Sequence, residues 1–115
     1  MVNMDTFVLG PTEIWAGHSD PMLERDAYAI ASAMKLPLEN LRIENVSTDS
    51  ETFRAKHIPS IEFCSLTQST RHLLHSVYDQ VSAINEDDYY STYHLLSAYL
   101  AYLDQVVQSR STESK

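Results

Sequence analysis

Three side chains close together in the sequence are of the kinds that bind metal ions. His72 and His75 are three residues apart, which suits one helix face or one loop, and Asp79 follows shortly after. Two imidazoles and a carboxylate are suitable ligands for a transition metal. Two solvated histidines in a polar loop would have the same spacing, so both interpretations stay open.

Asp5 is a second residue that could bind a metal ion. It lies in the segment Val2–Leu9, which is otherwise mostly apolar and predicts a short strand buried on both faces. A carboxylate inside such a strand is costly unless it is paired, protonated or bound to a metal ion. Alternatively, Asp5 stands at the end of the strand and caps a neighbouring loop.

Several other kinds of site are excluded by the sequence. It contains no G-x-S-x-G, no H-E-x-x-H and, with two glycines in all, no glycine-rich phosphate loop. The single cysteine, Cys64, cannot form an internal disulfide, and its apolar surroundings indicate a buried structural thiol.

The net charge and the hydropathy of the chain exclude some classes of binding partner. The chain has 115 residues, enough for one domain, and a formal charge of −8, which repels nucleic acids and anionic membranes. No apolar run approaches the roughly 20 residues that span a bilayer. Met1–Leu9 has no basic region and carries Asp5, so we expect no signal peptide there, although one could lie in a preceding segment.

Two helices are predicted by capping residues and apolar spacing. The first begins at Ser19-Asp20-Pro21 and ends before Pro37. The second, Glu86–Gln108, begins after Asn85. Their expected buried faces are Leu23, Ala27, Ile30, Ala31 and Met34 in the first, and Tyr89, Tyr93, Leu96, Leu100, Leu103 and Val107 in the second.

The remaining elements complete an α/β pattern. Strands are predicted at Leu41–Val46 and Ile58–Cys64, with a short helical turn over Thr48–Lys56 between them. A long connection, Ser65–Ser82, precedes the last helix. The order predicts helices covering a sheet of three strands, too few for a comfortable sheet of this type, so the pattern looks like half of a fold.

Three segments, taken together, resemble the di-zinc aminopeptidases, the family of bacterial leucyl aminopeptidases and aminopeptidase Y. Thr48–Phe53 followed by His57–Phe63 is similar to the family's SD-x-x-x-F…G-I-P-S-I segment. His75–Val81 with Ile84 is similar to its H-S/T-x-x-D-x-x-x-x-I segment, and Val2–Thr6 to its x-N-x-D strand. His57 departs from the pattern, since the family usually has glycine before I-P.

The resemblance implies a zinc site, but only part of one. Asp5 would be a ligand of one zinc ion and His75 of the other, with Asp79 as a carboxylate that fixes the loop behind them. The other ligands and the general-base glutamate of the two-zinc site precede the matching region, and neither Glu13 nor Glu62 stands in the position of that base. Each metal would keep one protein ligand instead of the usual three, so we expect the chain alone to be inactive.

The resemblance also implies a fold and a substrate. Residues 1–108 would form the C-terminal half of a three-layer α/β/α zinc-exopeptidase-like domain, a partial fold with a mixed sheet, and residues 109–115 a disordered tail. The complete domain would remove N-terminal residues from a peptide substrate. Two alternatives remain: a non-catalytic interaction module that binds a partner chain or a second copy through an exposed sheet edge, and a glutaminyl-cyclase-like relative.

Overall fold

Four short strands form one mixed sheet in the computed structural model, which describes residues 1–41, 48–66, 70–73 and 76–113. The order across the sheet is β1-β4-β2-β3. β1 is parallel to β4 and β2 to β3, whereas β4 and β2 are antiparallel. The strands are β1 Val2–Met4, β2 Glu13–Trp15, β3 Glu39–Leu41 and β4 Ile61–Cys64. With three α-helices, this confirms the predicted α/β class with a mixed sheet.

The helix α1, Pro21–Met34, begins where the sequence predicted. The side chain of Asp20 accepts hydrogen bonds from the amides of Met22 and Leu23, which satisfies two donors of the first turn. The helix ends at Met34 and is capped by Lys35, whose left-handed backbone lets its amide donate to carbonyls of the last turn.

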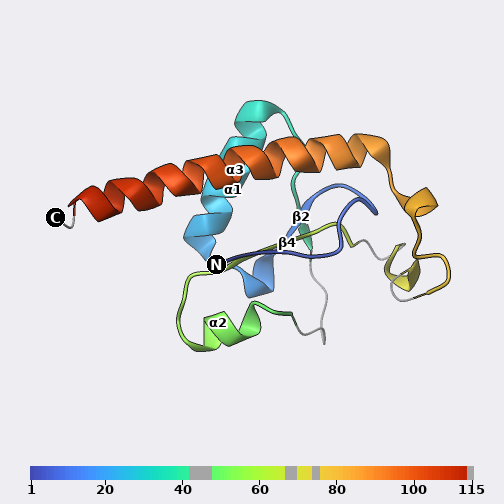
Figure 1. Ribbon diagram of the computed structural model, residues 1–115, viewed down its shortest axis with the longest axis horizontal. Helices are drawn as coiled ribbons and strands as arrows, with labels where there is room; N and C mark the ends of the chain where they lie inside the picture. Colours follow the sequence, from blue (N-terminus) through green and yellow to red (C-terminus); the bar gives the residue numbers. More distant parts are fainter. Residues whose placement is uncertain (42–47, 67–69, 74–75, 114–115) are drawn as a thin grey trace.

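The helix α3, Glu86–Glu113, begins as predicted but continues five residues beyond the expected end at Gln108. The side chain of Asn85 accepts from the amide of Asp88 at 3.0 Å. The polar residues 109–113 therefore continue the helix. Its C-terminal part projects beyond the rest of the molecule (Figure 1).

The buried face of α3 differs from the predicted one. Thr92, Leu95 and Tyr99 are buried together with Leu96, whereas Tyr93 is 61% exposed. Apolar residues at three- and four-residue spacing form more than one stripe along a helix, so the spacing alone does not decide which stripe is buried. Tyrosine can lie in an exposed stripe because its hydroxyl group reaches water. The predicted positions that lie exposed are Tyr89, Tyr93, Leu100 and Val107.

One face of the sheet packs against α1 and α3 to form the main core. Phe63 of β4 and Tyr99 of α3 meet edge to face, with ring centroids 5.3 Å apart. The hydroxyl of Tyr99 donates to the carbonyl of Leu23, which joins the two helices. The buried members of this cluster are Ile14, Ala27, Ile61, Phe63, Leu96 and Tyr99.

The helix α2, Glu51–Ala55, lies on the other side of the strands from α3 (Figure 1). It falls within the predicted helical turn Thr48–Lys56. None of its residues is buried, so it adds little to the core.

Two strand predictions need correction. The predicted strand Val2–Leu9 is paired only over Val2–Met4, because Thr6 and Val8 adopt left-handed backbone angles that interrupt a strand. β2 was not predicted, and the sheet formed by the described residues has four strands rather than three. β2 has three residues, too few to show an alternating pattern.

The other two strands differ from prediction mainly in their bounds. β4 begins at Ile61, after Pro59, which has no amide hydrogen to donate. Of the strand predicted at Leu41–Val46, only Leu41 lies within the described residues, at the end of β3.

Candidate functional site

A cavity of about 510 Å³ lies where the chain leaves β1. One wall is the segment that follows β1, and the other is the turn before α3. The lining residues are Asp5, Thr6, Phe7, Val8, Leu9, Asp79, Gln80, Val81 and Ile84. The structure therefore brings Asp5 and Asp79, two of the three predicted site residues, to the walls of one cavity.

The first wall is held in a strained backbone conformation. Thr6 and Val8 have φ angles of 55° and 65°, a region that β-branched residues rarely adopt. The carbonyl of Thr6 accepts from the amide of Ser65 at 2.8 Å, and that of Val8 from the amide of Asn85 at 3.1 Å. These bonds tie the wall to the end of β4 and the start of α3, so the surrounding fold maintains the strain.

Asp5 stands just beyond the end of β1 and is exposed, not buried inside a strand. Its amide donates to the carbonyl of Phe63, and its Oδ1 accepts from the hydroxyl of Thr6 at 3.1 Å. Asp5 is therefore not a buried carboxylate that needs a metal ion to offset the cost of burial. Its position at a strand end agrees with the alternative interpretation.

Asp79 belongs to a turn in which its amide donates to the carbonyl of Ser76 at 3.1 Å. Its side chain is exposed. His75, the other predicted ligand, lies outside the described residues, and His72 is exposed in the 3₁₀ turn Arg71–Leu73. Within the described part of the chain, no three His, Cys, Asp or Glu side chains form a group that could hold a metal ion.

Two buried carboxylates were not expected from the sequence. Glu13 and Glu62 are 5% and 1% exposed, on the central strands β2 and β4. Asn3 donates to Oε1 of Glu62 at 2.5 Å. The Oε2 atoms of both glutamates have no hydrogen-bond partner among the described residues. Burying a carboxylate oxygen without a hydrogen-bond partner costs folding free energy. Residues that are buried at such a cost are candidates for a functional site.

The sheet register places these carboxylates around the one cysteine. Glu13 is the antiparallel partner of Cys64, and Glu62 precedes Cys64 by two residues on the same face of β4. Burial, with Glu39 adding repulsion, raises the pKa of Glu13 to about 7. Burial also raises the pKa of the Cys64 thiol to about 12, with smaller contributions from Glu13 and Glu62. Cys64 is thus a buried thiol, as predicted, and is unsuited to act as a thiolate nucleophile.

A signal for Glu62 was present in the sequence. Period-two alternation in Ile61–Cys64 places Glu62 and Cys64 on the face opposite Ile61 and Phe63. No comparable signal existed for Glu13, because its burial follows from the central place of β2 in the sheet.

Comparison with known proteins gave no match to a family model, a curated protein or a solved structure. Among the described helices, none combines the length and the apolar character needed to cross a membrane.

Proposed function

We propose that this chain is the C-terminal portion of a zinc-dependent aminopeptidase-type domain and is inactive by itself. The observation that supports the proposal is the shared cavity of Asp5 and Asp79, residues that come from opposite ends of the resembling region. Asp5 supplies one zinc ligand, His75 supplies another, and Asp79 fixes the loop that carries His75. The substrate of the complete domain is the N-terminal end of a peptide.

The turn before β4 gives the resemblance additional support. His57 has a φ angle of 58°, in the left-handed region that favours glycine. The resembling family usually has glycine at this position. The backbone here therefore has the conformation that the family's residue would adopt most easily, although the side chain differs.

The described residues do not fit a resident zinc ion on their own. Asp5 is exposed, and no group of three suitable ligands surrounds it among the described side chains. Stable zinc sites use three or four protein ligands. The proposal therefore requires further ligands and the general base from outside this chain, as in a complete three-layer α/β/α domain.

Zinc titration of the purified chain tests this proposal. We expect binding no tighter than about 1 μM, because one or two ligands hold zinc weakly. Asp5→Asn and His75→Ala should weaken that binding further, whereas Asp104→Asn, an exposed carboxylate on α3, should leave it unchanged. The purified chain should not hydrolyse an aminoacyl-p-nitroanilide.

Two results would contradict the proposal in different ways. Tight, stoichiometric zinc would show that the chain holds a complete site. Equal zinc affinity in the wild type and the Asp5→Asn variant would remove Asp5 from the ligand set.

An interaction module is the second candidate function, favoured by exposed apolar side chains in the segment before α3, two of which line the cavity. Val77 and Val81 are 84% and 82% exposed, and Tyr78 and Ile84 are also exposed. Exposed apolar clusters of this kind occur at protein contacts. Light scattering after size-exclusion chromatography would distinguish the two functions, because a monodisperse oligomer that is insensitive to zinc and chelator favours the interaction module.

A further inference from the structure

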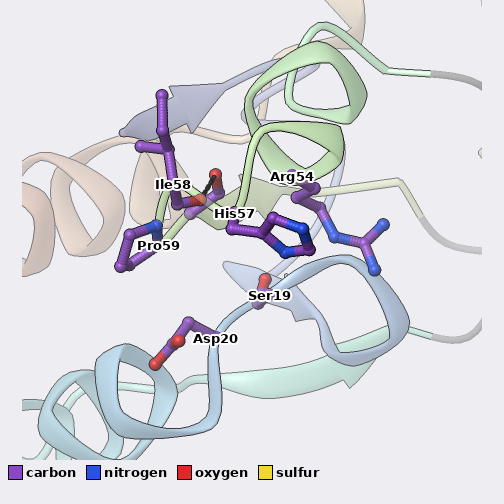
Figure 2. Close-up of a pocket in the computed structure, with 7 residues that line it drawn as sticks. Ser19, Asp20, Arg54, His57, Ile58 and Pro59 are labelled. Carbon is purple, nitrogen blue, oxygen red and sulfur yellow. Dashed lines mark hydrogen bonds between the residues drawn. The ribbon is translucent and has the colours of Figure 1, made fainter.

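A second cavity, of about 280 Å³, lies where α2 leads into β4 and faces the start of α1. It is at the opposite end of the β1–β4 pair from Asp5, since it adjoins the residues before Ile61. The lining residues are Ser19, Asp20, Arg54, His57, Ile58, Pro59 and Ser60. Figure 2 shows the imidazole of His57 beside the Arg54 side chain and above Ser19, with the Asp20 carboxylate turned away from both.

Arg54 supplies the guanidinium group at this cavity. The formal charge is −8, yet the described residues place no carboxylate in a salt bridge with Arg54. Its Nη1 lies 3.4 Å from Nδ1 of His18, whose ring packs against Trp15 with centroids 4.3 Å apart. That contact uses one of the five N–H donors of a guanidinium group.

The other polar side chains of the cavity are already engaged. The hydroxyl of Ser19 donates to the carbonyl of Trp15 and accepts from the amide of Glu62. The hydroxyl of Ser60 donates to the carbonyl of Ile58.

Asp20 is engaged too, because its Oδ1 caps α1 and so satisfies the helix N-terminus. Among the described side chains that line the cavity, the donors that remain available to a ligand belong to Arg54 and His57.

Backbone hydrogen bonds fix the turn that carries these two exposed side chains. The amide of His57 donates to the carbonyl of Arg54 at 2.9 Å, and that of Ile58 to the carbonyl of Phe53 at 3.0 Å. The amide of Asp20 donates to the carbonyl of Ser60 at 2.7 Å, which ties the start of α1 to β4. The cavity therefore presents the Arg54 guanidinium and the His57 ring on a fixed turn, and the one acceptor recorded against them among the described residues is Nδ1 of His18.

We propose that this cavity binds a small oxyanion, with the Arg54 guanidinium as the main contact and the His57 ring as a second donor. A guanidinium group forms paired hydrogen bonds with the oxygens of a carboxylate or a phosphate. The small volume fits a single anionic group rather than a long ligand. The site is independent of the proposed peptidase function.

Calorimetric titration of the full chain with inorganic phosphate and, separately, with acetate at low ionic strength tests the proposal. We expect saturable one-site binding of at least one anion, and the stronger of the two identifies the ligand class. Arg54→Ala should weaken binding roughly tenfold or more, and Arg54→Lys should weaken it less, because lysine keeps the charge but loses the paired geometry. The matched control is Arg25→Ala, which removes the same charge from an exposed position on α1.

His57→Gly provides a second, independent variant. It removes the imidazole donor and relieves the left-handed strain, so it should weaken anion binding while the fold is retained. Circular dichroism checks the fold of each variant. The proposal is overturned if neither anion binds saturably, or if Arg25→Ala weakens binding as much as Arg54→Ala does.

Discussion

The two faces of the central strands are equally buried but chemically opposite. Ile14, Ile61 and Phe63 face α1 and α3 and join an apolar core. On the alternate positions, Glu13 and Glu62 are buried with one oxygen each that lacks a described partner. Apolar burial stabilises a fold, whereas burial of an unpartnered carboxylate opposes it. The apolar face therefore accounts for the stability of the fold, whereas the polar face carries groups that selection for stability alone would not retain.

The largest expected effect is on the apolar face. Tyr99→Ala should lower the free energy of unfolding by about 3–5 kcal/mol, because it empties a fully buried site and removes the bond to Leu23. Urea denaturation followed by circular dichroism measures the change. Tyr93→Ala, on the exposed side of the same helix, should change it by less than about 0.5 kcal/mol. Similar losses in both variants would mean that the assigned core face is wrong.

The second prediction concerns Glu13 on the polar face. Its pKa rises from 4.5 to about 7 on folding, so the folded state holds the proton more tightly than the unfolded state. The stability linked to this proton is fully present below pH 4.5 and is lost as the pH rises to about 7. At about 1.4 kcal/mol for each pH unit of this interval, the loss is at most about 3–4 kcal/mol.

Glu13→Gln isolates this effect because glutamine does not ionise. The free energy of unfolding of the variant, relative to the wild type, should rise between pH 4.5 and 7 and then level off. Glu39→Gln is the control: it removes only the smaller, repulsive cause of the pKa change, so the wild-type trend should persist in weaker form. A difference between wild type and Glu13→Gln that does not vary with pH would show that Glu13 does not titrate in this range.

The smallest expected effect lies in the turn that leads into β4. His57→Gly should stabilise the fold by up to about 1 kcal/mol, because glycine adopts the left-handed angle without strain. Thermal unfolding would show a slightly higher midpoint. If the same variant also binds oxyanions more weakly, the imidazole serves binding at a cost to stability. A lower midpoint would instead show that the His57 side chain stabilises this turn.

Local signals in the sequence predicted the local structure well. Asp20 and Asn85 cap their helices as expected, because capping depends on residues within one turn. The predicted strand Val2–Leu9 was wrong beyond Met4, since its apolar composition does not report the left-handed angles of Thr6 and Val8. The prediction of His75 as a ligand stays a prediction, as does zinc itself.

The sequence by itself determined the α/β class, the two long helices and the buried state of Cys64. Only the tertiary structure decided that β2 lies at the centre of the sheet, that Glu13 is buried there, and that Asp5 and Asp79 share a cavity. The physical reason is the range of the interactions involved. Caps and helical periodicity act between neighbours in the chain, whereas burial and cavities depend on which distant segments pack together.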